Sequence, residues 1–365
     1  MISVAFEKSL TTITEGAFLG CTALSTINAP GVTTIEKDAF NSCEALNTVS
    51  CSSLETVGEN AFYGCTSLFS VTDDKIVNVG NGAFANTVNL TSFASTVINR
   101  IGNSAFEGSG VAELGIANAA EIGDYAFKNC NALTQICISN ATSVGRGAFS
   151  GCASATTASL PLLVTIPQEC FSSCSKLSAV GANGAETVDS YAFKDCSALK
   201  DLGALKKVCS YAFDGAGLTK VSSNVIDIVE EYAFNNCKKL TSFSLSRISS
   251  FDLSVLKGAS ALQYISLVGT ADITFPEEGI ADICPSLKSF QGSNMTSIPD
   301  NAFKDCTALS TVTCTVVESI GKNAFNNTAL TELNFPNLTE VSEGSFANIP
   351  TLKSVTLTGV KELYA

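Results

Sequence analysis

The sequence predicts an α/β solenoid, a curved and right-handed array of about 16 coils. A parallel β-sheet is expected on the concave side and short helices or turns on the convex side. Two observations predict this fold. A phenylalanine returns every 20 to 22 residues along most of the chain, and small and aliphatic residues follow it at fixed offsets. Copies of this length bury their apolar face only against their neighbours, so a stack forms one continuous core. The recurring residues are Phe18, Phe40, Phe62, Phe84, Phe106, Phe127, Phe149, Phe171, Phe193, Phe213, Phe234, Phe303, Phe325 and Phe346.

Residues 35–54 show the pattern of one coil, beginning with its strand. Leu46, Val49 and Cys51 alternate with polar neighbours, which is the periodicity of a short strand. Thr48 and Ser50 are therefore expected to face outward.

A bend and a second apolar pair, such as Leu54 and Val57, come after the strand. Gly58 follows that pair directly, where glycine allows either a positive φ or a close approach of two coils. About two turns of helix are then expected, with Phe40, Cys43 and the next leucine on one face at a spacing of three.

Two degenerate copies occupy the long interval between Phe234 and Phe303, centred near Leu256 and Ala281. We expect the stack to bulge or change curvature over residues 248–290. No linker, low-complexity tract or charge block divides the sequence, so residues 1–365 are predicted to form one domain. A period in the twenties with aliphatic residues at fixed offsets is typical of leucine-rich repeats.

The composition argues against two classes of partner. The formal net charge is −13, and no basic run exceeds the pairs Lys206-Lys207 and Lys238-Lys239. Nucleic acids and anionic membrane surfaces both require a concentrated positive surface. No apolar run approaches the roughly 18 residues of a membrane span, so no membrane insertion is expected.

The two ends of the sequence bear on its location. No basic segment followed by an apolar stretch opens the chain, so no secretory signal is recognised. The sequence begins and stops inside repeats, whereas solenoids normally carry polar caps. The missing caps have three possible explanations, which are truncation, end-to-end association through uncapped termini, and burial of an end against a partner.

Most cysteines of the chain share one repeat position, three residues after the phenylalanine. Equivalent side chains in stacked coils point in parallel, which is poor geometry for disulfides. Where cysteine is absent, the small residues Thr87, Ser109, Ala216 and Thr328 replace it. We therefore predict a ladder of buried reduced thiols, which favours a reducing compartment. The ten residues are Cys21, Cys43, Cys65, Cys130, Cys152, Cys174, Cys196, Cys237, Cys284 and Cys306.

Four cysteines outside the ladder differ in expected reactivity. Cys137 takes an outward strand position and Cys209 takes the glycine position of its coil, so both are expected to react first with an alkylating agent. Cys51 and Cys314 point inward with their strands and are expected to stay protected.

The offsets of phenylalanine, cysteine and leucine resemble the BspA-like leucine-rich-repeat family, close to the type first noted in treponemal proteins. The family pattern is apolar-x-x-Ile-Gly-x-x-Ala-Phe-x-x-Cys-x-x-Leu-x-x-Ile-x-Leu-Pro, and nearly the whole chain is similar to it. Proline is kept in only some copies, and the usual signal peptide is missing. The resemblance implies protein binding and cell-surface adhesion, as in oral and gut bacteria and parasitic protists. Residues 35–49, 57–71, 122–136 and 320–335 match the pattern.

The inventory of reactive residues excludes most catalytic designs. The chain has no histidine, which removes the commonest general base and metal ligand. No phosphate-binding glycine loop or zinc-protease motif occurs, and a ladder of thiols on one face does not converge on a metal. We predict no enzymatic activity, no cofactor and no metal.

The outward strand positions form a long, nearly uncharged surface rich in Ser and Thr. Such residues suit a solvent-exposed sheet face, and the same face is the expected groove for a protein partner. Tyr264 is the favoured anchor because aromatic residues dominate binding hot spots. The other candidate partner-binding residues on this face are Glu113, Gln135, Asp201, Lys220 and Glu332.

A row of tyrosines is the second candidate surface. Tyr125, Tyr191, Tyr211 and Tyr232 all precede the phenylalanine of their coil by two positions. Aligned coils would stack Tyr191, Tyr211 and Tyr232, which come from consecutive repeats. The row either fills crevices between the expected helices or forms an exposed aromatic stripe for a partner.

Two functions remain open at this stage. The first is a non-enzymatic module that binds an unidentified protein through the solenoid surface, with a role in cell-surface adhesion. The second is an intracellular scaffold built into a larger, for example cytoskeletal, assembly through its ends or its tyrosines. The absence of a signal and the many unpaired cysteines favour an intracellular location, whereas the family resemblance favours the cell surface.

Overall fold

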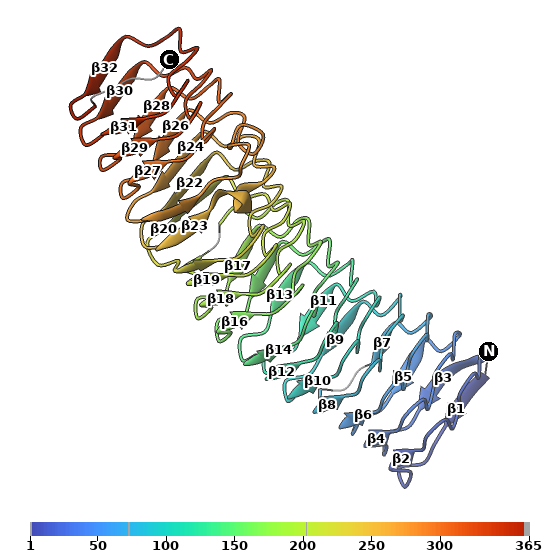
Figure 1. Ribbon diagram of the computed structural model, residues 1–365. Coiled ribbons are helices and arrows are strands. Elements are labelled where there is room, and N and C mark those ends of the chain that lie inside the picture. Colours follow the sequence, from blue (N-terminus) through green and yellow to red (C-terminus); the bar gives the residue numbers. More distant parts are fainter. Residues whose placement is uncertain (1, 72–73, 202, 361–365) are drawn as a thin grey trace. The chain divides into compact units, whose positions relative to one another are not determined.

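The computed structural model describes residues 2–71, 74–201 and 203–360, drawn as a ribbon in Figure 1. The chain divides into two compact units. Unit 1 covers residues 1–199 and unit 2 covers residues 200–365. Each unit is a parallel β-solenoid, and together they contain about 16 coils, as the repeat predicts. No helix within the described residues is long and apolar enough to cross a bilayer.

Each coil of unit 1 carries two short strands, drawn from blue to green in Figure 1. The first strand is the one that the sequence predicts: in β5, Thr48 and Ser50 are exposed while Val49 between them is buried. The first strands are β1 (Ile2–Ala5), β3 (Leu24–Asn28), β5 (Thr48–Ser50), β7 (Ser70–Val71), β9 (Ser92–Ala94), β11 (Glu113–Gly115), β13 (Gln135–Cys137), β15 (Thr157–Ser159) and β17 (Ala179–Gly181).

The second strand of each coil was not predicted. It lies where the sequence shows only the second apolar pair, and seven of these strands stack in the order β14-β12-β10-β8-β6-β4-β2. The second strands are β2 (Thr12–Ile13), β4 (Thr34–Ile35), β6 (Thr56–Val57), β8 (Asn78–Val79), β10 (Arg100–Ile101), β12 (Glu121–Ile122), β14 (Ser143–Val144), β16 (Thr165–Ile166) and β18 (Thr187–Val188).

Unit 2 repeats the same two-strand coil. Its first strands are β20 (Lys220–Ser223), β22 (Ser242–Leu245), β24 (Tyr264–Leu267), β26 (Ser289–Gln291), β28 (Thr311–Thr313), β30 (Glu332–Phe335) and β32 (Ser354–Leu357). Its second strands are β19 (Lys207–Val208), β21 (Ile228–Val229), β23 (Ser250–Asp252), β25 (Asp272–Thr274), β27 (Ser297–Ile298), β29 (Ser319–Ile320) and β31 (Glu340–Val341).

The predicted helix around each phenylalanine is wrong, because this segment is a series of turns. In the second coil, Asp38 and Ser42 have φ of 53° and 60°, and equivalent residues in most other coils share this left-handed conformation. An α-helix requires a negative φ at every residue. The amides of Asp38, Phe40 and Ser42 donate instead to carbonyls of the next coil, at 2.9, 2.8 and 2.7 Å. The turns therefore form a third ladder between coils, and we call its outer surface the turn face.

Stacked phenylalanines form the core of unit 1. The rings of Phe18 and Phe40 lie 5.2 Å apart and nearly parallel, at 4°, and the stack continues coil by coil to Phe193. Apolar residues of both strands close the core around these rings. One ring per coil therefore sets the packing between neighbouring coils.

The degenerate copies depart from the regular two-strand coil. Within the described residues, the one helix is a 3₁₀ turn, η1 (Leu253–Leu256), and the side chain of Asp252 caps it by accepting from the amide of Ser254 at 2.8 Å. The hydrogen-bonded ladder of second strands in unit 2 is interrupted here. Its strands pair in three groups, β19-β21, β23-β25 and β27-β29-β31. Phe275 and Phe290 supply rings against Phe303 in these coils.

In six coils a glycine directly follows the second strand, and there it permits a close approach of coils and not a positive φ. A Cβ added to Gly102 would lie 2.6 Å from the backbone of Gly80 and Asn81, which no real side chain tolerates. The same holds at Gly58, Gly80, Gly123, Gly145 and Gly321.

Gly102→Ala should therefore destabilise unit 1 by about 1–3 kcal/mol, because the two coils must separate to admit the methyl group. Gly181→Ala is the matched control. Its added Cβ would meet its nearest atom at an ordinary 3.6 Å, so little change is expected. Urea denaturation of both variants measures the difference, and equal stabilities would show that the coil spacing is not fixed by Gly102.

Candidate functional site

The strand face, formed by the outward residues of the first strands, is the first candidate surface. In unit 2 the parallel register places Lys220, Ser242, Tyr264, Ser289 and Thr311 in one row. Neighbouring members of the row lie about 4.8 Å apart. Tyr264 is 50% exposed and stands above small hydroxyl neighbours. This row brings two predicted residues, Lys220 and Tyr264, within two coils of each other.

The remaining predicted residues of this face are exposed but dispersed. Glu113 lies beside Ser92 in unit 1, and Gln135 lies beside Thr157. Glu332 opens β30 in unit 2. Asp201 is also exposed, but no strand contains it, and its side chain accepts from the amide of Gly203 at 3.4 Å. The prediction that Asp201 stands on a strand is therefore wrong.

Some charged side chains on the other surfaces form ion pairs between neighbouring coils. Exposed pairs of this kind contribute little stability. None of these pairs includes a residue of the strand face. They are Lys37–Glu59, Arg100–Glu121, Lys128–Glu107, Arg146–Glu169, Lys207–Glu230, Arg247–Asp227 and Lys322–Glu343.

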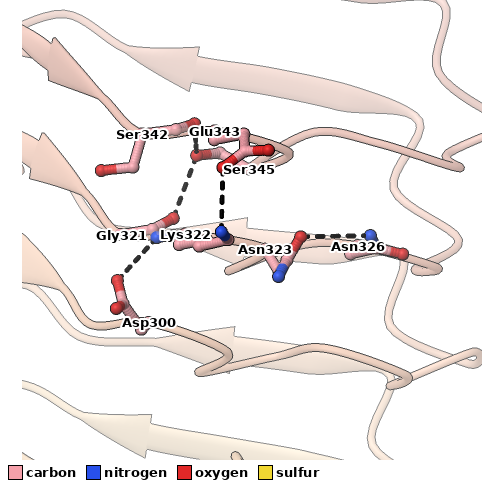
Figure 2. Close-up of polar contacts among 8 residues, drawn as sticks. All are labelled: Asp300, Gly321, Lys322, Asn323, Asn326, Ser342, Glu343 and Ser345. Carbon is pink, nitrogen blue, oxygen red and sulfur yellow. Dashed lines mark hydrogen bonds and ion pairs between the residues drawn. The ribbon is translucent and has the colours of Figure 1, made fainter. Parts of the chain in front are cut away.

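Figure 2 shows how closely these contacts tie successive coils of unit 2 together. The backbone amide of Lys322 donates to Asp300 Oδ1 at 2.6 Å, while Lys322 Nζ lies 2.8 Å from Glu343 Oε2. The hydrogen bond between these two side chains lowers the pKa of Glu343 and raises the pKa of Lys322. Ser345 Oγ donates to the carbonyl of Gly321 at 3.0 Å. The polar groups in this region are thus engaged within the protein.

Three charged residues lie on the strand face. Within the part of the chain that the structure describes, Glu113, Lys220 and Glu332 have no ion-pair partner. An exposed charge without a partner is available for electrostatic attraction to another molecule.

The tyrosine row lies on the turn face, and its members are half-buried. Tyr211 and Tyr232 stack in unit 2 with ring centroids 5.1 Å apart. In unit 1, Lys128 Nζ lies 5.1 Å from the ring centroid of Tyr125, and Lys194 Nζ lies 5.5 Å from that of Tyr191. All four tyrosines have φ between 55° and 60°, because their position belongs to the turn ladder. The row therefore packs against turns, and not in crevices between helices.

The comparisons with known proteins identify the repeat. A family model described as the BspA type leucine rich repeat region matches residues 1–112, 99–208, 181–288 and 281–364. The chain belongs to the BspA-type leucine-rich-repeat family. A search of curated proteins found no match.

Solved structures of bacterial leucine-rich-repeat proteins are similar to this BspA-type chain. A protein from Bacteroides ovatus is 20% identical with a TM-score of 0.46, over 97% of this chain and 82% of the other. A leucine rich cell surface protein from Faecalibacterium prausnitzii is 22% identical with a TM-score of 0.43, over 84% and 83%. The T. pallidum leucine-rich-repeat protein is 20% identical with a TM-score of 0.30, over 55% and 78%.

The cysteine of the BspA-type repeat makes a specific hydrogen bond that size alone does not explain. Cys43 Sγ donates to the carbonyl of Phe18 in the preceding coil at 3.0 Å. The same contact recurs from Cys65, Cys130, Cys152, Cys174, Cys196 and Cys237 at 3.0 to 3.2 Å. Thr87 and Thr328 instead donate to the phenylalanine carbonyl of their own coil. The position thus selects a small donor, with Ala216 as an exception.

Burial of the thiols largely follows the prediction. The cysteines form no disulfides, and nine of the ten ladder residues are buried, Cys21 being exposed. Burial raises the pKa of Cys130, Cys174 and Cys237 to about 12. Cys51 and Cys314 are buried and Cys137 is exposed, as expected.

The expectation for Cys209 is wrong, because it is 7% exposed. The thiol is therefore covered and should react slowly. Alkylation should therefore begin at Cys137 and Cys21.

Within the described residues, no group of three or more His, Cys, Asp or Glu side chains is arranged to hold a metal ion.

Two hollows of the surface were not predicted from the sequence. A hollow of about 590 Å³ adjoins Ser70 and Ser92 on the strand face of unit 1. A second hollow, of about 570 Å³, opens on the turn face of the same unit. Neither follows from the repeat pattern, because each is confined to a few coils.

Proposed function

We propose that this BspA-type chain is a non-catalytic module that binds a protein partner on the strand face of unit 2. The observation that carries the proposal is the aligned row on this face. The parallel register places Lys220 and a set of small polar residues in line with Tyr264, the one aromatic side chain of the row. Tyr264 is 50% exposed, and Lys220 and Glu332 have no ion-pair partner among the described residues.

This surface has the composition of a protein-binding patch. A half-exposed tyrosine supplies a large contact area at low entropic cost, and such residues dominate binding energy when a partner covers them. Ser and Thr hydroxyls of the neighbouring strands add hydrogen bonds without blocking approach. Unpaired charges at the edge of a patch raise the rate of association and select the partner by sign. Adhesion at a cell surface is one setting for such a module.

The same proposal covers a second setting, an intracellular scaffold. The stacked pair Tyr211 and Tyr232 supports it, because an aromatic stack that is only half-buried offers area for a further contact. The buried, reduced thiols of both units also suit a reducing compartment.

A photo-crosslinking amino acid placed at Tyr264 or at Tyr232 tests the proposal in cells that make the protein. The same partner should be captured from position 264 and not from 232, and Tyr264→Ala should weaken its affinity by about 30-fold or more, as for a hot-spot residue. Lys220→Glu combined with Glu332→Lys should slow association at low salt.

The matched control is Tyr63→Ala, which removes a tyrosine of similar exposure, 40%, from the turn face of unit 1. It should leave partner affinity unchanged. Capture from position 232 alone would favour assembly through the tyrosine stack. A Tyr264→Ala variant that binds its partner with full affinity would contradict the strand-face site.

A further inference from the structure

The hollow of about 570 Å³ on the turn face of unit 1 is lined mainly by side chains that carry no charge. Its size falls within the range of about 300–1,000 Å³ found for small-molecule sites. Five asparagines and one tyrosine give it its chemical character: Asn60, Asn81, Asn86, Asn103, Asn129 and Tyr63.

The hollow exists because the fourth coil carries very small residues at two positions. Gly82 precedes Phe84 by two residues, and Ala85 follows it directly. The third coil carries Asn60 and Tyr63 at these positions, and the fifth carries Ser104 and Glu107. The result is a notch one coil wide between two walls of larger side chains. An added Cβ at Gly82 would lie 2.2 Å from Asn60 Oδ1, so this glycine is also what leaves room for the Asn60 amide.

The asparagines present unused hydrogen-bonding groups. Asn81 Oδ1 accepts from the amide of Asn103 at 2.9 Å, and Asn103 Oδ1 accepts from the amide of Asp124 at 3.0 Å. Among the described residues, the Nδ2 groups of these two asparagines have no acceptor. The side chains of Asn60, Asn86 and Asn129 make no hydrogen bond there at all. Each side-chain amide offers two N–H donors and one carbonyl acceptor.

The charges at the hollow cancel locally. Glu59 Oε1 lies 3.1 Å from Lys37 Nζ, and Glu107 Oε1 lies 3.1 Å from Lys128 Nζ. No unpaired cation is therefore present among the lining residues to hold an anion, and the described residues form no carboxylate cluster for a metal. The chemistry favours an uncharged ligand with many hydroxyl groups.

We propose that this hollow binds a neutral sugar. The phenol ring of Tyr63 is 40% exposed at the wall of the hollow. Its apolar face suits the C–H side of a pyranose ring. Ring hydroxyls, each both donor and acceptor, pair with the asparagine amides across the notch. The hollow belongs to the turn face of unit 1 and Tyr264 to the strand face of unit 2, so the sugar and the protein partner of the proposed function use different residues.

Titration calorimetry of the full chain with maltose, cellobiose, lactose and diacetylchitobiose tests the proposal. At least one of these neutral sugars should bind. Tyr63→Ala should weaken that binding about tenfold, whereas Tyr63→Phe should retain it, because the ring provides the contact. Ala85→Lys should also weaken sugar binding by about tenfold or more, because the lysine side chain fills the notch. Lysine is compatible with the fold at this position, since Lys128 occupies it in a later coil.

The matched control is Leu19→Ala, which removes a side chain 57% exposed at the position of Tyr63 in the first coil. It should leave sugar binding unchanged. Thermal unfolding of each variant confirms that the fold is intact. No binding of any of the four sugars, binding of the acidic sugar sialyllactose alone, or full binding by Ala85→Lys would each overturn the proposal.

Discussion

Phe127→Ala should destabilise unit 1 by about 3–5 kcal/mol, the cost of emptying a fully buried aromatic site. The Phe127 side chain has no exposed surface, and its ring lies 5.1 Å from that of Phe106 and 5.5 Å from that of Phe149. Each coil is stabilised only by its neighbours, so the cavity weakens two coil interfaces at once. The midpoint of urea denaturation should fall accordingly.

Two matched controls separate the loss of ring stacking from other causes of destabilisation. Phe69→Ala removes a phenylalanine that is 61% exposed. Its effect on the free energy of unfolding should therefore stay within about 0.5 kcal/mol, as for other surface substitutions. Cys130→Ala removes the buried thiol that donates to the carbonyl of Phe106 at 3.0 Å, at a cost of roughly 1 kcal/mol. If Phe127→Ala and Phe69→Ala were equally stable, the phenylalanine stack would not be the core.

The sequence was sufficient for the features that repeat with every coil. The phenylalanine period gave the number of coils, the alternation around Val49 gave the first strand, and the offset of Cys43 gave a buried thiol. Each of these signals is averaged over many copies, so single exceptions do not obscure it.

The helix prediction failed for a specific physical reason. A spacing of three between phenylalanine, cysteine and leucine brings them to one side in a helix and in the observed turns alike. The signal that separates the two is the residue type at the left-handed positions, where Asn, Asp, Gly and Ser are common. Asp38 and Ser42 are such residues. The second strands were missed because two residues, as in Thr56–Val57, are too few to show alternation.

The candidate sites were harder to predict than the fold. Lys220 and Tyr264 share a row only because the parallel register aligns Ser242 with both. The hollow depends on two small residues in one coil, Gly82 and Ala85, and appears in the sequence only when the coils are aligned position by position. Departures from the repeat therefore distinguish these candidate sites better than the repeat itself does.

The thiol ladder should make the protein unusually sensitive to alkali. Burial raises the pKa of Cys130 and Cys174 in unit 1 to about 12, and in unit 2 it does the same for Cys237, Cys284 and Cys306. In the unfolded chain these thiols regain an ordinary pKa near 8.5. Between these two values the folded state retains protons that the unfolded state has lost.

The free energy of unfolding should therefore fall as the pH rises above about 9, and the loss should end near pH 12. Each thiol with so large a shift contributes a slope of up to about 1.4 kcal/mol per pH unit. Below the pKa of the unfolded thiols the stabilisation is fully present, because both states are then protonated. Urea denaturation between pH 8 and pH 11 measures the slope.

Serine substitutions identify the thiols as the cause, because a serine hydroxyl keeps the donor and does not titrate in this range. The double variant Cys130→Ser, Cys174→Ser should have a slope shallower by about 2–3 kcal/mol per pH unit. Cys137→Ser removes an exposed thiol and should leave the slope unchanged. Lysines and tyrosines titrate equally in all three proteins, so they cancel in the comparison. An unaltered slope in the double variant would mean that the ladder thiols already ionise in the folded state, and the packing account of the cysteines would be wrong.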